Sequence, residues 1–254
     1  MPIHSIGSGH SGIRLAEASV RSALSAKPAS FWFQDPSHES IPFVTVSREP
    51  GAGAIGFAHR LAEKLSETDS AQWTAWDQEL VEKISSEHHL GKRIVDMIED
   101  RRYSWVEQLM EYISMNEGGA NPDEVKVYRR TAVTIRALAQ AGRAVIVGRG
   151  GVFVTAGMPG GTHLRLVASL EYRIANFAQT NHCSEREAAK RVAEITDNRA
   201  RFYHRHWPKA RLVPETFTLT LNVGQLSLDD MVACVLPAVR SRHESRLMQG
   251  AKNG

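Results

Sequence analysis

The sequence has few of the features that mark membrane, secreted or metal-binding proteins. It has 254 residues and only two cysteines, and Cys183 and Cys234 are too far apart for a metal or redox motif. Both are expected to be small buried or half-buried residues, which suits a reducing cytoplasm. No apolar run approaches the roughly 18 residues of a membrane span, and the first residues lack the apolar core of a signal peptide. These absences predict a cytoplasmic protein without membrane contact.

Charge of one sign is also scarce, because the formal net charge is only +3. Such a balance does not by itself argue for a nucleic-acid partner. The one basic stretch, residues 196–211, holds few aromatic residues and spells no known nucleic-acid-binding module. The 42% hydrophobic content is enough for one sizeable core.

The chain divides into three parts by composition. Residues 1–40 contain the glycine- and serine-rich stretch "IGSGHSG" and are interrupted by Pro28 and Pro36, so we expect a partly ordered extension. The aromatic residues at 31–33 could pin this extension to the body, or serve a partner or a homodimer. Residues 41–243 form the main domain, and residues 244–254 are expected to be a flexible tail.

Strands and helices alternate from residue 41 onward. Periodicity predicts strands at 41–47, 72–76, 162–169 and 215–222, and a strand with a glycine turn at 143–151. It predicts helices at about 55–65, around 80–84, and at 92–115, 123–141, 170–181, 184–206 and 227–243. Gly142 is expected to end one helix, and Ser184 with Glu187 forms a capping box for another. Strands placed between helices imply a three-layer α/β fold, with a parallel sheet covered on both faces.

A glycine-rich stretch, "VSREPGAGAIGFAHRLAEKL" at residues 46–65, joins the first strand to its helix. Ligands of such folds gather at the carboxyl ends of the strands, and a helix N-terminus attracts anions. In the register of a G-x-x-x-x-G-K-[ST] loop, Arg48 takes the first glycine position and Gly53 the second. Ala54 then replaces the lysine, and Ile55 replaces the metal-binding hydroxyl. The spacing alone fits either a phosphate site or a tight strand-to-helix turn.

Several motifs in this order resemble the cytidylate-kinase-like family of P-loop kinases. They are "VTVSREPGAGAIGFAHRLAEKL", "WDQELVEKI", "AVIVGRGG", "LRLVASLEYRI", "AAKRVAEITDNRARFYHRHW" and "FTLTLNVGQLSLDDMV". The resemblance covers about residues 42–240. It implies a nucleoside-monophosphate-kinase fold with a five-stranded parallel sheet, a phosphate loop and an Arg-rich lid, acting on nucleotides with ATP and Mg²⁺. Members of this branch commonly carry an S-R-E-x-G-S/A-G loop, so the missing lysine is partly a trait of the branch.

The resemblance assigns roles to the residues near the strand ends. The donor phosphates are expected at Arg48 and at the backbone of Gly51, Ala52, Gly53, Ala54, Ile55 and Gly56. Asp77 is expected near the nucleoside monophosphate, or serves only as a helix N-cap. Arg149 of "GRGG" stands where cytidylate kinases carry the arginine of G-R-D, and Gly150 replaces the aspartate. Arg149 either grips a phosphate or pairs with a nearby carboxylate.

The basic stretch at 196–211 is the candidate lid. Arg199, Arg201 and Arg205 could converge on the transferred phosphate, and Arg201 and Arg205 share one face at helical spacing. The alternative is a solvated basic helix end that its dipole favours. Arg130, on the helix at 123–141, either reaches a substrate phosphate or is solvated.

Two classes of function follow. The first is an ATP-dependent kinase of a nucleoside monophosphate or similar acceptor, in which Arg48, Arg149, Arg199, Arg201 and Arg205 position and stabilise the transferred group. The second is a non-catalytic nucleotide-binding or regulatory protein with a degenerate loop. Glu49 and Asp197 are the candidate carboxylates that could hold Mg²⁺ through bound water, although neither belongs to a metal-ligand pattern.

Overall fold

Five parallel strands form the centre of the domain. The computed structural model describes residues 41–79, 81 and 122–250, so the extension at 1–40 and the helix predicted over 92–115 lie outside the described residues. The strands are β1 (Phe43–Arg48), β2 (Thr74–Trp76), β3 (Ala144–Val147), β4 (Gly161–Val167) and β5 (Leu219–Asn222). They are arranged in the order β2-β3-β1-β4-β5, and every neighbouring pair is parallel. The predicted α/β fold with a five-stranded parallel sheet is confirmed.

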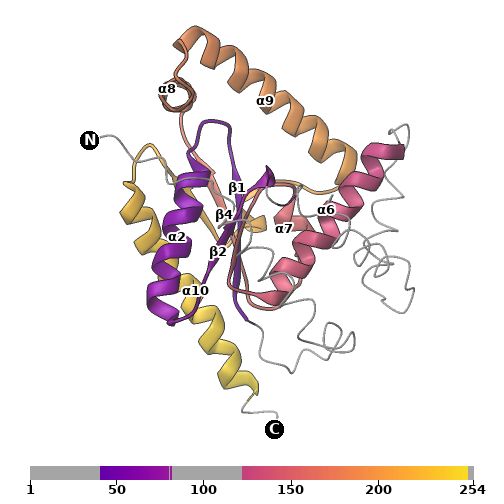
Figure 1. Ribbon diagram of the computed structural model, residues 1–254, viewed down its shortest axis with the longest axis vertical. Helices are drawn as coiled ribbons and strands as arrows, with labels where there is room; N and C mark the ends of the chain where they lie inside the picture. The colour runs from indigo at the N-terminus through magenta and orange to yellow at the C-terminus, as the bar shows by residue number, and fades with distance from the viewer. Residues whose placement is uncertain (1–40, 80, 82–121, 251–254) are drawn as a thin grey trace.

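The alternation of side chains along each strand separates two hydrophobic cores. Val44 and Val46 of β1 belong to the core beneath α2 (Ala54–Asp69) and α10 (Leu228–Gly250). Phe43 of the same strand belongs to the core beneath α6 (Pro122–Ala141), on the face that also carries the short α7 (Gly151–Val154). Because successive side chains of a strand point to opposite faces, β1 is covered on both sides and its end is fixed in the middle of the domain (Figure 1).

A helical hairpin follows β4. It consists of α8 (Leu170–Asn181) and α9 (Glu185–His206), and α9 runs from α8 across to α6 (Figure 1). Ser169 caps α8 by accepting a hydrogen bond from the Tyr172 amide, and Ser184 caps α9 by accepting one from the Glu187 amide. The predicted ends of both helices and the Ser184 cap are therefore confirmed.

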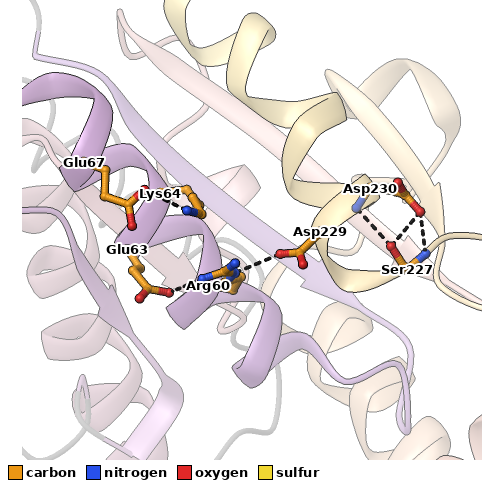
Figure 2. Close-up of polar contacts among 7 residues, drawn as sticks. All are labelled: Arg60, Glu63, Lys64, Glu67, Ser227, Asp229 and Asp230. Atoms are coloured by element: carbon orange, nitrogen blue, oxygen red, sulfur yellow. Dashed lines mark hydrogen bonds and ion pairs between the residues drawn. The ribbon is translucent and has the colours of Figure 1, made fainter.

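Polar contacts join the beginnings of α2 and α10 at the surface. Arg60 of α2 bonds both Glu63, one turn on, and Asp229 of α10 (Figure 2). Ser227 and Asp230 cap the start of α10 reciprocally. Exposed ion pairs of this kind each contribute about 0–1 kcal/mol, so they align two helices that the core already holds.

The glycine turn predicted after the third strand is present: β3 ends at Val147, and Gly148, Arg149 and Gly150 all have positive φ and turn the chain into α7. Other predicted ends differ from the structure. β5 begins only at Leu219, because a short 3-10 turn at Pro214–Thr216 precedes it. α10 continues to Gly250, beyond the predicted end at 243. Cys183 is half-buried as expected, but the prediction for Cys234 is wrong, since it is exposed on α10. No described helix is both long enough and apolar enough to cross a membrane.

Candidate phosphate site at the carboxyl end of β1

The connection from β1 to α2 is a tight loop that packs against α8. Gly51 has φ +82° and Gly53 has φ +66°, both in the left-handed region that favours glycine. A Cβ on Gly51 would collide with the backbone carbonyl of Arg173 in α8. Asn176 of the same helix donates to the Gly51 carbonyl at 2.7 Å. The glycines of this loop are thus required by its shape and by the close approach of α8.

The start of α2 offers backbone donors without a side-chain cap. Gly53 is the N-cap residue, no side chain bonds the first turn, and the first turn contains no acidic residue. Within the described part of the chain, no acceptor faces the amides of Gly53, Ala54, Ile55 and Gly56; the first helical bond runs from Phe57 to the Gly53 carbonyl. Uncapped amides and the helix dipole make this end a favourable place for an anion.

Arg48, at the last position of β1, directs its guanidinium over the neighbouring strand end. That group lies against Gly148 after β3, where a Cβ would collide with it. Burial lowers the pKa of Arg48, and the nearby Arg149 lowers it further, whereas Tyr203 and Asp77 act in the opposite direction. Guanidiniums held close together in a buried site repel each other, and an anionic ligand would reduce that repulsion.

Arg199 of α9 lies close to Arg48 and Arg149 at the end of β1. Its Nη1 donates to the Arg48 carbonyl at 2.8 Å. Burial lowers the pKa of Arg199 to about 10, and the neighbouring Arg48 and Arg149 contribute to the decrease. Tyr203, one turn further along α9, lies beside Ser47; burial raises the pKa of its phenol, while Arg48 and Arg199 oppose that shift. Three guanidiniums from three segments therefore meet at the end of β1, and we call Arg48, Arg149 and Arg199 the arginine cluster.

Arg149 is held by aromatic residues of α6 and α9. Its guanidinium lies over the Phe202 ring, 5.8 Å from the centroid. The next residue, Gly150, has φ +70°, and a Cβ there would lie 3.0 Å from Trp207 Nε1 and 3.1 Å from Tyr128 Oη. Trp207 donates to that Tyr128 hydroxyl at 2.8 Å. A side chain at residue 150 would thus crowd the Tyr–Trp pair and would need a left-handed backbone, and both give a physical reason for glycine at this position.

The other predicted site residues are placed differently. Arg201 is exposed and bonds Asn198 on its own helix, and Arg205 is exposed and pairs with Glu124 of α6. Arg130 is exposed on α6, and no other described residue bonds its side chain. Asp77, by contrast, lies close enough to raise the pKa of Arg48. Its carbonyl also accepts the Val81 amide, as expected at the start of a helix.

The described residues contain no preformed metal-binding site. Among them, no group of three or more His, Cys, Asp or Glu side chains could hold a metal ion. Glu49 is already engaged, since its Oε2 accepts the Ala168 amide at 3.2 Å and lies 3.4 Å from Arg173 Nε. Asp197 is exposed on α9. A Mg²⁺ ion here would have to arrive with most of its ligands supplied by phosphate and water, as Mg²⁺ commonly does.

Sequence reasoning did not single out three residues of this region. Tyr203 lies between Arg48 and Arg199, and Asn176 holds the loop. Arg165 of β4 is in register with Ser47; it donates to the Leu212 carbonyl and lies 5.6 Å from the Phe217 ring centroid. The period of β4 could have placed Arg165 on one face of the sheet. Nothing in the local pattern of α8 marks Asn176.

Comparisons with known proteins agree with this architecture. No curated protein matches the chain. Among solved structures, the chain is similar to an uncharacterized protein from Eubacterium ventriosum ATCC 27560. That likeness has a TM-score of 0.59 and 15% sequence identity, and it covers 79% of this chain and 98% of the other, so it shows the fold alone. The model of the cytidylate kinase-like family matches residues 43–225. Because this match spans well over half of the 254 residues, the chain belongs to the cytidylate kinase-like family.

Proposed function

We propose that the protein is an ATP-dependent phosphotransferase that phosphorylates a nucleoside monophosphate, cytidylate-like, or a similar small acceptor. The observation that carries this proposal is the arginine cluster at the carboxyl end of β1, the strand that leads through the glycine loop into the uncapped first turn of α2. In phosphoryl transfer the charge of the moving group must be stabilised and the reactants aligned, and no covalent intermediate on the protein is required. A fixed set of cations and amides suits that task.

The donor phosphates would bind at the β1–α2 loop. The open amides of Gly53, Ala54, Ile55 and Gly56 would donate to the phosphate oxygens. Arg48 would supply the cation that a P-loop lysine supplies elsewhere, because it is the last residue of β1 and its guanidinium is held near Arg149 and Asp77. A guanidinium can also bind two phosphate oxygens at once, which an ammonium cannot do with the same geometry.

The acceptor and the lid would complete the site. Arg149, held over Phe202, would bind the acceptor phosphate, and Arg199 would stabilise the group in transfer. An acceptor oxygen would then form a bond to the γ-phosphorus while the bond to the β–γ bridging oxygen breaks, so that ADP leaves with the bridging oxygen. Mg²⁺ bound to the nucleotide would neutralise phosphate charge. The contribution of the chain itself is alignment and stabilisation of charge.

The second candidate function is nucleotide binding without turnover. Ala54 and Ile55 replace the lysine and hydroxyl of a full P-loop, and Gly150, which lies close to the Tyr128–Trp207 pair, carries no carboxylate. Under this alternative the anion site would remain, but acceptor recognition or transfer would be lost. Binding of ATP is expected under both functions, so only product formation separates them.

The deciding experiment incubates the purified protein with ATP, Mg²⁺ and a panel of nucleoside monophosphates. Product chromatography or phosphorus NMR follows nucleoside diphosphate formation. Turnover that Arg149→Ala abolishes and that Arg201→Ala leaves intact would support the kinase, since Arg201 lies exposed outside the cluster. ATP binding without product from any acceptor would favour the non-catalytic protein. Absence of ATP binding would contradict both.

A further inference from the structure

The β1–α2 loop is held from outside by α8. The peptide unit between Gly51 and Ala52 has both of its polar groups occupied. Its carbonyl accepts from Asn176 Nδ2 at 2.7 Å, and its N–H donates to the Glu49 carbonyl at 3.2 Å. A peptide bonded at both ends cannot rotate without losing both bonds, so its orientation is fixed.

The peptide unit between Arg48 and Glu49 is fixed in the same way. Its carbonyl accepts from Arg199 of α9 at 2.8 Å, and its N–H donates to the Leu166 carbonyl of β4 at 3.0 Å. Two carbonyls of one short connection are therefore taken by the two helices of one hairpin. Glu49 adds a third tie through its carboxylate, which accepts the Ala168 amide at 3.2 Å.

The direction of these carbonyls matters for an anion. A carbonyl oxygen repels a phosphate oxygen, whereas an N–H group attracts it, so a phosphate loop works when its carbonyls point away from the ligand. Gly51 and Gly53, both left-handed, allow the backbone to alternate in this way. The amide of Asn176 donates to the Gly51 carbonyl and so holds it toward α8.

We infer that Asn176 is a positioning residue for the phosphate loop: it holds the Gly51 carbonyl toward α8 and so keeps the amides of Gly53 to Gly56 arranged for a polyphosphate. The inference rests on the proposed function for the identity of the ligand. The contact between Asn176 and Gly51 also joins the loop to the candidate lid, because α8 leads directly into α9, which carries Arg199.

The test compares two variants of Asn176 with a matched control on the same helix. Asn176→Ala removes the donor, and Asn176→Asp keeps the shape but places a carboxylate against the Gly51 carbonyl. The control is Asn181→Ala, because Asn181 only bonds the Phe177 carbonyl of its own helix. The probes are ATP and inorganic tripolyphosphate, titrated calorimetrically. We expect binding weaker by about fivefold to tenfold for Asn176→Ala and by more for Asn176→Asp, but by less than about twofold for Asn181→Ala.

Two further measurements separate positioning from a merely structural role. If the wild type turns over, the KM for ATP should rise in the Asn176 variants while the KM for the acceptor stays unchanged. Without any ligand, hydrogen exchange of the Ala52 amide should accelerate in both Asn176 variants and not in Asn181→Ala. Unchanged exchange at Ala52, or equal affinities for all three variants, would overturn the inference. A wild type that binds neither probe would refute the proposed function instead, and the exchange experiment would still decide the role of Asn176.

Discussion

Replacing Arg199 by alanine should weaken nucleotide binding strongly and change the stability of the fold very little. The pKa of Arg199 falls to about 10 through burial and through the charges of Arg48 and Arg149. At about 1.36 kcal/mol per pKa unit, the charged side chain costs the folded state on the order of 3 kcal/mol. Because the folded-state pKa is the lower one, this cost is present at every pH below about 10 and fades only above it.

The cost is offset by the hydrogen bond that the same side chain makes. Its bond to the Arg48 carbonyl has a charged donor, and such bonds contribute about 1.5–3 kcal/mol. The two contributions nearly cancel, so Arg199→Ala should change the free energy of unfolding by less than about 1 kcal/mol and the Tm by a few degrees at most. An ordinary half-buried side chain would destabilise the fold when truncated.

Binding should respond very differently. A polyphosphate adds negative charge beside the clustered guanidiniums, and loss of one partner of a desolvated charge pair costs about 2–3 kcal/mol or more. The Kd for ATP should therefore rise about 30- to 150-fold. Calorimetric titration with ATP measures this effect, and thermal unfolding in the absence of nucleotide measures stability.

Arg201→Ala is the matched control for this comparison. Arg201 lies two residues along the same helix, is exposed, and bonds Asn198 instead of the cluster. It should bind ATP within about twofold of the wild type, because an exposed charge outside the site is screened. Unchanged ATP affinity in Arg199→Ala, or an equal loss in both variants, would refute the assignment of Arg199 to the anion site.

Three further predictions concern the loop, a buried histidine and the lid. Gly51→Ala should lower the free energy of unfolding by about 1–3 kcal/mol, because φ is +82° and the new Cβ would collide with α8. Gly56→Ala lies in open space within α2 and should raise the free energy of unfolding by about 0.5–1 kcal/mol. Urea unfolding of the two variants measures both effects. His206 is buried against Tyr128 and burial lowers its pKa to about 4, so the stability it contributes is present above about pH 6.5 and is lost as the pH falls toward 4. His206→Gln should reduce the loss of unfolding free energy between pH 6.5 and pH 4 by about 1–2 kcal/mol. His204→Gln should leave this pH dependence unchanged, because His204 is exposed. Saturating ATP should slow tryptic cleavage within residues 199–211, and equal rates with and without ATP would contradict the lid.

Local patterns in the sequence determined most of the architecture. The alternation of strands and helices, the glycine loop after the first strand and the Ser184 cap each depend on residues that are close in sequence. Their physics is local: side-chain period, left-handed glycines and helix caps operate within a few residues. Arg48, Asp77 and Arg149 could be named in advance because each lies at or just after the end of a predicted strand. Arg199 could be named because it lies in the basic stretch that resembles the lid of the family.

The tertiary structure decided which of these residues meet. Arg199, Arg201 and Arg205 look alike in sequence, yet only Arg199 contacts β1, because the docking of α9 against α6 and α8 fixes which side of the helix faces the sheet. The contact between Asn176 and Gly51 joins residues 125 positions apart, and the Tyr128–Trp207 bond joins residues 79 positions apart. Such contacts depend on how helices pack over a sheet edge, and side-chain spacing along one segment carries no information about the distance to another.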